Sequence, residues 1–225
     1  MRILRIALLV FGLFSGVFAG DIRIFIIQGI DANAESYWYP WLKSELSSEI
    51  GKEIKAENIS VPDMPKKAEL QLWKDKIKEA VGIVDENTYF VTHGMGGIAT
   101  LKYIEESGKK VGGVVLVSSY ISSDTKNITA FENTQLDYKN LGENIKHISV
   151  LATRDDKGAP YKLSEELAEK LGAKFILEQG GKIKSSNENK ADYVSPRIIY
   201  SEIKLMINAD LPKPKENLKS KDDKK

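Results

Sequence analysis

The chain of 225 residues has no cysteine, and this absence excludes disulfide bonds and thiol chemistry. Hydrophobic packing must therefore hold the fold together. Neither sign of charge is in excess, since 33 lysines and arginines face 32 aspartates and glutamates, and such a chain offers no electrostatic case for nucleic acid as a partner. Histidine is scarce as well. Only His93 and His147 are present, they lie far apart, and we expect neither a metal nor a cofactor.

The first residues differ in kind from the rest of the chain. Arg2 and Arg5 precede an apolar run over residues 6–14, and small residues follow up to Ala19. These are the three regions of a secretory signal peptide. The apolar part is too short for an ordinary membrane-spanning helix, and an uncleaved anchor is the alternative. We therefore expect a signal peptide over residues 1–19, export to the periplasm or the cell exterior, and no membrane span after cleavage.

The last residues form a second break in composition. Residues 212–225 read PKPKENLKSKDDKK and contain six lysines, three acidic residues and almost no apolar side chain. Such a segment cannot bury enough apolar surface to fold, so we expect a disordered, lysine-rich tail. Between the two ends lies one domain over residues 21–211.

Within that domain, apolar runs alternate with amphipathic segments. The runs predict strands at 22–27, 54–61, 88–92, 111–118, 147–152 and 174–177. The amphipathic segments predict helices at 41–50, 68–81, 98–106, 161–171 and 196–208. We expect residues 120–140 to be irregular. The alternation predicts an α/β fold, in which a parallel central sheet is covered by helices on both faces of a single compact domain.

One predicted strand runs directly into a glycine-rich turn and a helix. After Thr92 the sequence is His93-Gly94-Met95-Gly96-Gly97. Strand, sharp turn and helix are the layout of the nucleophile elbow, G-x-S-x-G. The position of the serine is Gly94, which has no side chain. No histidine follows His147 to complete the usual order Ser, Asp, His.

Six features spread along the chain together point to one known family. They are Tyr37-Trp-Tyr-Pro-Trp41-Leu, Val61-Pro-Asp-Met-Pro65, Trp73, the elbow, Arg154-Asp-Asp156 with Pro160, and Gly180-Gly181. In this combination the chain resembles the small serine hydrolases typified by retinoblastoma-binding protein 9 and bacterial YdeN. The resemblance covers residues 22–207. It implies an α/β-hydrolase fold with a Ser-His-Asp triad and activity on small ester or amide substrates.

The resemblance also assigns the site position by position. The nucleophile falls on Gly94, the acid on Asp156 and the histidine on Lys182. The His-Gly pair that the family carries after its first strand is Gln28-Gly29 in this chain. Three of these four positions are changed, and the acid alone is retained.

The elbow predicts a binding site even without its serine. The turn leaves the backbone N–H of Met95 pointing into the pocket, beside an N–H of Gly29 or Ile30. Donors at the N-terminus of a helix can hold a carboxylate, a phosphate or a carbonyl without reacting with it. We expect a pocket that is lined in part by Met95, Tyr120 and Ile121.

Three of these patterns have other interpretations. Asp156 can be a turn residue that caps the helix beginning near Pro160. The segment Gly94-x-Gly96-x-x-Ala99 matches a dinucleotide fingerprint, but Ser118 and Ser119 stand where that motif needs an acidic residue. The same two serines, at the end of a predicted strand, can instead offer a displaced nucleophile.

The leading hypothesis is a secreted pseudoenzyme of the serine hydrolase family that binds a small ligand or a protein partner. Glycine supplies neither the oxygen nor the proton that acyl transfer requires. Lys182 can act as a base only if a serine is there to activate. The alternative is an active ester or amide hydrolase that uses Asp156 with water or with a serine elsewhere. We take a monomer as the working expectation.

Overall fold

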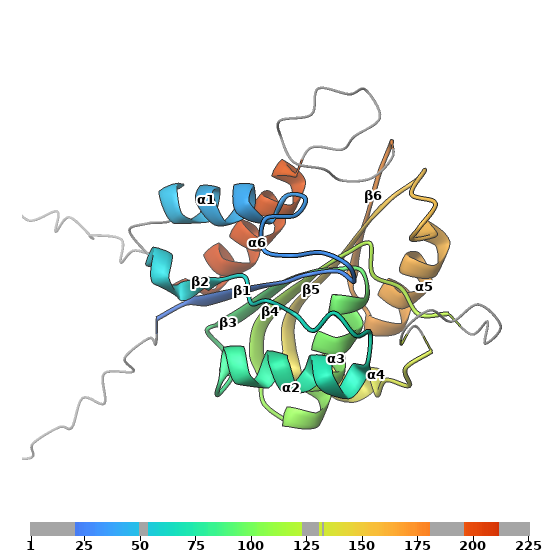
Figure 1. Ribbon diagram of the computed structural model, residues 1–225, viewed down its shortest axis with the longest axis horizontal. Coiled ribbons are helices and arrows are strands. Elements are labelled where there is room, and N and C mark those ends of the chain that lie inside the picture. Colours follow the sequence, from blue (N-terminus) through green and yellow to red (C-terminus); the bar gives the residue numbers. More distant parts are fainter. Residues whose placement is uncertain (1–20, 50–53, 123–130, 132, 181–195, 212–225) are drawn as a thin grey trace, which may run out of the picture.

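A computed structural model describes residues 21–49, 54–122, 131, 133–180 and 196–211. Six strands form one sheet in the order β2-β1-β3-β4-β5-β6, and every neighbouring pair is parallel (Figure 1). The strands are β1 Arg23–Ile27, β2 Ile59–Ser60, β3 Thr88–His93, β4 Val111–Val117, β5 Ile145–Thr153 and β6 Lys174–Glu178. The predicted signal peptide and tail lie outside the described residues.

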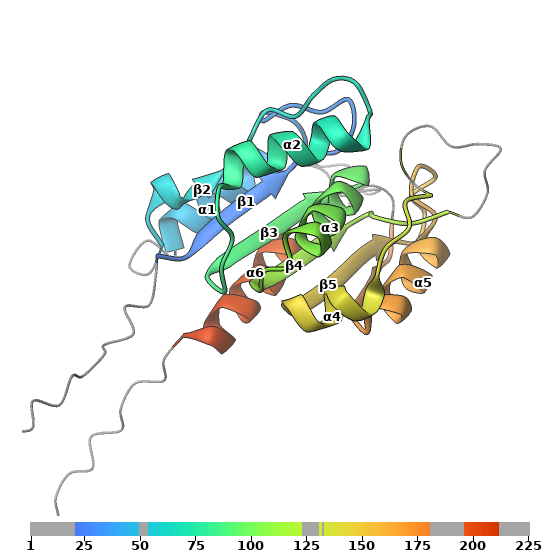
Figure 2. The same ribbon diagram turned by 90° about the horizontal axis from the view of Figure 1, so that it is seen from below.

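Helices cover both faces of this sheet. They are α1 Tyr39–Glu49, α2 Leu70–Val81, α3 Met95–Ser107, α4 Tyr138–Asn144, α5 Tyr161–Leu171 and α6 Arg197–Asp210, with a short 3₁₀ helix η1 at Ala56–Asn58. Helices α1 and α6 lie on one face, and α2 to α5 lie on the other (Figure 2). The predicted parallel sheet with helices on both faces is confirmed. In the described part of the chain, no helix is long and apolar enough to span a membrane.

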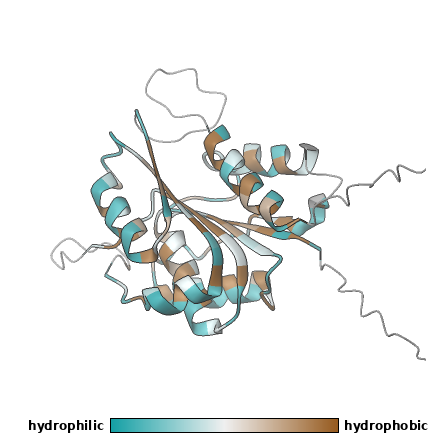
Figure 3. Ribbon diagram, turned by 180° about the vertical axis from the view of Figure 1, so that it is seen from behind, coloured by the Kyte–Doolittle hydropathy of each residue, from teal (hydrophilic) through white to brown (hydrophobic). Residues whose placement is uncertain are grey.

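Alternating residues of the central strands fill two separate cores. In β1, Phe25 and Ile27 pack toward α2 and α3, whereas Ile24 and Ile26 pack toward α1 and α6. Parallel strands that are buried on both faces are apolar at almost every position, which is why these segments appear as continuous runs in the sequence. Figure 3 shows the apolar residues gathered on the strands and on the helix faces that meet them.

Some predicted boundaries are wrong for local reasons. The stretch expected to be irregular, residues 120–140, ends in the first three residues of α4, a short helix that Asp137 caps by accepting a hydrogen bond from the Asn140 N–H at 3.0 Å. Only Leu141 of that helix is buried, so the helical period in the sequence is weak. The strand expected over 54–61 is reduced to two residues because η1 occupies its first half.

The order of the strands marks where a ligand can bind. From β1 the chain crosses through α1 to β2 at one edge, whereas from β3 it moves through α3 to β4 on the other side. Open parallel sheets bind ligands outside the carboxyl ends of their strands at such a switch point. In this protein the switch point lies between β1 and β3.

Candidate functional site

Gly94 is the single residue between strand β3 and helix α3. Its backbone has φ 52° and ψ −128°, and its N–H donates to the Val117 carbonyl at 2.9 Å. The positive φ is the strained turn that gives a nucleophile elbow its shape. A Cβ atom placed on Gly94 would meet nothing within 4 Å. The structure therefore holds the elbow conformation and leaves the space for a small side chain empty.

The two glycines that follow bring α3 close to the strand ends. A Cβ on Gly96 would lie 2.1 Å from the Gln28 carbonyl oxygen, and one on Gly97 would lie 2.3 Å from Ser119 Oγ. Any larger residue would push the first turn of α3 away from β1 and β4. Ser119 Oγ also donates to the Gly94 carbonyl at 2.8 Å, so the turn is fixed from its β4 side as well.

One of the amides predicted for the anion hole has a partner within the protein. The Gly29 N–H already donates to Tyr39 Oη at 3.0 Å, so Ile30 becomes the better of the two candidates after β1. Met95 begins α3, and the first N–H groups of a helix have no partner within the helix. The amides of Met95 and Ile30 therefore stay the predicted donors of this anion hole.

Tyr39 joins the loop after β1 to the elbow. Its Oη lies 2.7 Å from His93 Nδ1 and also accepts the Gly29 N–H. Burial raises the pKa of Tyr39 above its usual value, so the hydroxyl keeps its proton. In the tautomer of His93 that has its proton on Nε2, Tyr39 Oη donates to Nδ1. The sequence analysis missed this bond, although the Trp38-Tyr39 segment was among the features that carried the resemblance.

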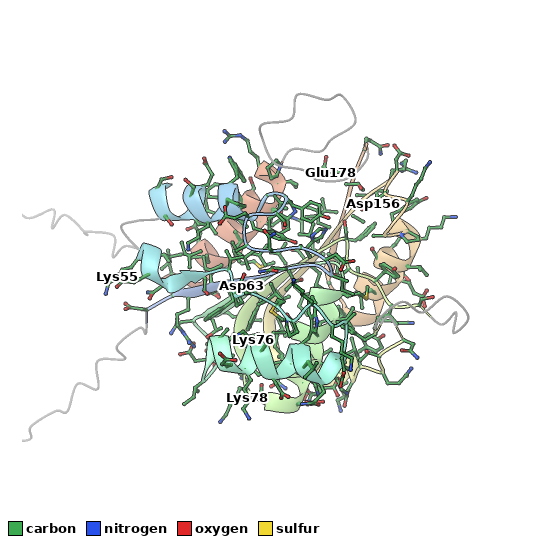
Figure 4. All side chains as sticks on the ribbon, viewed as in Figure 1. Lys55, Asp63, Lys76, Lys78, Asp156 and Glu178 are labelled. Atoms are coloured by element: carbon green, nitrogen blue, oxygen red, sulfur yellow. The ribbon has the colours of Figure 1, made fainter. Side chains whose placement is uncertain are left out.

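Asp156 follows β5 and is nine-tenths buried, with 9% of its surface exposed. Its Oδ1 accepts the Gly158 N–H at 2.9 Å, and its Oδ2 faces Ser118 Oγ at 3.4 Å. Helix α5 has Pro160 at its N-cap and no side-chain cap bond, so the capping interpretation of Asp156 is wrong. Figure 4 shows Asp156 near the end of β6, which Glu178 marks.

Strained backbone conformations lie around the carboxyl ends of the strands, where Gly94 and Asp156 also lie. Asp31, Tyr37 and Ser118 are the residues other than glycine that have positive φ in the described part, with values of 61°, 53° and 52°. The first two lie in the loop after β1 and the third directly follows β4. Strain of this kind costs about 1–3 kcal/mol per residue and clusters at functional sites.

The structure describes some of the remaining predicted site residues but not all of them. Tyr120, Ile121 and Ile30 are partly buried and pack against the core that contains Met95. Lys182 lies outside the described residues. Among those that are described, no group of three His, Cys, Asp or Glu side chains could hold a metal ion. The expectation of no cofactor stays a prediction.

Comparison with known proteins agrees with this geometry. The serine hydrolase family model matches residues 24–190. YdeN of Bacillus subtilis is 30% identical over 163 residues, which cover 71% of this chain and 84% of that protein. Serine hydrolase RBBP9 of Rattus norvegicus is 28% identical over 141 residues, which cover 61% and 73%. The crystal structure of the B. subtilis ydeN product superposes with a TM-score of 0.70 at 25% identity, over 83% of this chain and 99% of that one. The α/β-hydrolase fold that the sequence predicted is confirmed.

Proposed function

The chain belongs to the serine hydrolase family, and on that premise we propose that it is an exported, catalytically inactive member that binds a small ligand or a protein partner at the former active site. The observation that supports this most directly is Gly94. The backbone at this position has the conformation of an elbow, with φ 52° and ψ −128°, and no side chain that could attack a substrate.

Loss of the serine and of the histidine removes two different parts of the chemistry. Acyl transfer needs a nucleophile and an aligned base that takes its proton. In a comparable hydrolase, removal of the serine alone costs about 10⁶ in turnover, and about 10³–10⁴ over water persists from the oxyanion donors and from binding. Lys182 at the histidine position has no elbow serine to activate.

The binding apparatus is retained beside the missing chemistry. The amide of Met95 opens helix α3 next to the switch point, and Tyr39 fixes the loop after β1 against His93. Amides at the positive end of a helix favour a carboxylate, a phosphate or the oxygen of a carbonyl. A group of this kind can bind at the elbow without being attacked.

Export rests on the signal-like residues 1–19. The test is the mass of the protein recovered from the periplasm or medium of an expressing bacterium. A mass that corresponds to cleavage after Ala19 supports export, and a protein that keeps these residues and stays in the membrane fraction supports the anchor alternative.

One observation favours a second candidate function, an active hydrolase with a displaced nucleophile. Ser118 is 5% exposed, has positive φ, and places its Oγ 3.4 Å from Asp156 Oδ2. A carboxylate is a weak base for a serine hydroxyl, because its pKa lies well below that of the alcohol. This arrangement is therefore the less favoured of the two.

Ester hydrolysis separates the two functions. The chain from Asp21 onward is assayed with short-chain p-nitrophenyl esters beside its Ser118→Ala and Asp156→Ala variants. The pseudoenzyme proposal expects no turnover above the residual level in any of them. Turnover at rates typical of serine hydrolases that disappears in both variants would establish the displaced nucleophile instead.

A further inference from the structure

Strand β6 forms one edge of the sheet, and it differs from the strand at the opposite edge (Figure 1). The edge strand β2 has two residues, whereas β6 has five, Lys174-Phe-Ile-Leu-Glu178, and each of them is at least partly exposed. In the part of the chain that the structure describes, β6 pairs with β5 on one side and with no strand on the other. A very short edge strand is a common protection against pairing with another chain. Strand β6 does not have this protection.

The helices near β6 lie mainly over the inner strands. Helix α6 packs chiefly against β4, and α5 packs more closely against β5 than against β6. The side chain of Lys174, at the start of β6, is 57% exposed. The outer side of β6 is therefore within reach of another chain.

The backbone of β6 presents hydrogen-bonding groups on this outer side. The Glu178 carbonyl accepts the Arg154 N–H at 2.9 Å and therefore faces β5. The backbone groups of successive residues in a strand point to opposite sides. Phe175 and Leu177 therefore direct their N–H and C=O groups away from β5, toward the open edge.

The sequence of β6 is complementary to itself when two copies run antiparallel. A twofold axis at Ile176 places each Lys174 opposite the Glu178 of the other copy. The same axis places Phe175 opposite Leu177, and these are the residues whose backbone groups point outward. They form the hydrogen-bonded pairs of an antiparallel ladder, whereas the lysine–glutamate and isoleucine–isoleucine pairs are the ones whose Cα atoms approach to about 4.5 Å. Opposite charges in such pairs stabilise a sheet.

Other registers lose this match. A shift by two residues puts either Lys174 or Glu178 opposite Ile176, and a shift by one residue turns the side chains to the wrong face. Lys174 Nζ already contacts Glu202 Oε1 on α6 at 2.8 Å. An ammonium group has three donors, so this contact leaves donors for a second carboxylate.

We infer that the protein forms a symmetric dimer in which the β6 strands of two copies pair antiparallel about a twofold axis at Ile176. The two sheets become one continuous sheet, and the partner is a second copy because the charge pattern of β6 matches itself. A strand of five residues makes a small interface, and small interfaces are typical of weak association, with dissociation constants here on the order of 10–100 µM. The dimer replaces the monomer of the sequence analysis and does not depend on whether the protein is catalytically active.

Sedimentation velocity of the chain from Asp21 onward, at concentrations from about 1 to 500 µM, tests for the dimer. Glu178→Lys places like charges opposite each other at both ends of the paired strands, and we expect association to weaken at least about tenfold. Glu57→Lys makes the same change of charge at an exposed residue of η1, beside β2 at the opposite edge, and should leave association unchanged. Thermal melting checks that both variants are folded.

Cysteine cross-linking tests the register, because the chain has no cysteine of its own. In Ile176→Cys the two thiols face each other across the twofold axis, with Cα atoms about 4.5 Å apart, a separation that a disulfide can bridge. In Leu177→Cys the two thiols lie on a diagonal, with Cα atoms more than about 7 Å apart, which a disulfide does not bridge. Under mild oxidation, Ile176→Cys should therefore form the covalent dimer and Leu177→Cys should not.

Three results would overturn the inference. The first is a protein that stays monomeric over the whole concentration range. The second is a Glu178→Lys variant that dimerises as well as the natural chain, because the dimer would then use another surface. The third is a Leu177→Cys variant that cross-links as readily as Ile176→Cys does.

Discussion

The carboxylates at the amino ends and at the carboxyl ends of the strands differ in how many hydrogen bonds they accept. At the amino ends of the strands, Asp210 accepts hydrogen bonds from Tyr89 Oη at 2.6 Å and His147 Nε2 at 3.0 Å, and it also pairs with Lys146. At the carboxyl ends, Asp156 accepts one short bond, from the Gly158 N–H, and one longer contact from a serine. One carboxylate is surrounded by donors and the other is not.

Buried side-chain atoms without a hydrogen bond follow the same division only in part. In the part of the chain that the structure describes, three of the five are Gln28 Oε1, Trp38 Nε1 and Thr153 Oγ1, all near the carboxyl ends. The other two are Asn58 Nδ2, near the amino end of β2, and Ser164 Oγ, on helix α5. Polar groups that serve stability are usually satisfied, whereas unsatisfied groups and strained backbone collect where a site was built. The carboxyl ends of the strands therefore carry the features that are typical of a site.

Restoring the missing side chains is the change that should alter the carboxyl edge most. Gly94→Ser with Lys182→His is expected to raise turnover of p-nitrophenyl esters by at least about 10², out of the roughly 10⁶ that loss of a triad serine costs. The turn already has the elbow conformation, and a Cβ at this position meets nothing within 4 Å. Gly94→Ala with Lys182→His carries the same backbone strain without the hydroxyl and is the control. Equal rates in the two variants would show that the rest of the site is no longer aligned.

A substitution in the first turn of α3, which packs closely against the residue after β1, should have the next largest effect. Gly96→Ala places a Cβ 2.1 Å from the Gln28 carbonyl oxygen, and we expect a loss of about 3 kcal/mol in the free energy of unfolding, measured in urea. Gly142→Ala in α4 meets nothing within 4 Å and should be neutral or stabilising by up to about 1 kcal/mol. Similar losses in both variants would contradict the role assigned to Gly96.

The contrast between the two carboxylates can be measured directly. Asp210→Asn removes the charge that Tyr89, His147 and Lys146 share, and we expect it to cost about 2 kcal/mol of unfolding free energy. Asp156→Asn keeps an oxygen that can accept the Gly158 N–H and should cost less than about 1 kcal/mol. The comparison fails if Asp156→Asn proves the more damaging of the two.

Low pH should lower the free energy of unfolding through Asp210, which lies at the amino ends of the strands. Burial by itself would raise the pKa of this carboxyl group, but hydrogen bonds from Lys146, Tyr89 and His147 outweigh it and hold the pKa below its usual value. A depressed pKa means that the stabilisation is complete above the pKa of the unfolded chain, near 4, and is lost as the pH falls through the lower folded value. Urea midpoints between pH 6 and pH 3 should therefore fall less steeply in Asp210→Asn than in the natural chain.

Local patterns in the sequence were sufficient for most of the fold. Helix α5 was predicted over its observed range, because Pro160 and Gly172 flank a strongly amphipathic segment. The elbow was found because strand, glycine turn and helix follow one another directly. The order of the strands in the sheet did not follow from any of these patterns, since each is contained within a few residues.

The contacts that shape the site could not be found in the same way. Tyr39 meets His93 across 54 residues, and Gln28 meets Pro62 across 34. Each pair joins two segments that are distant in the sequence, and their approach depends on which strands lie side by side. The hydrophobic period of one segment carries no information about the position of another. The same limit explains why Asp156 was offered as a helix cap.

The conformation at Gly94 also bears on how such a protein evolves. A serine held at φ 52° would pay about 1–3 kcal/mol in backbone strain, and glycine adopts this conformation without that cost. An exchange of serine for glycine at this turn therefore removes the reaction and releases strain in one step. Where a protein of this fold is not selected for hydrolysis, glycine at this turn is therefore the more stable choice, and a return to serine would cost stability.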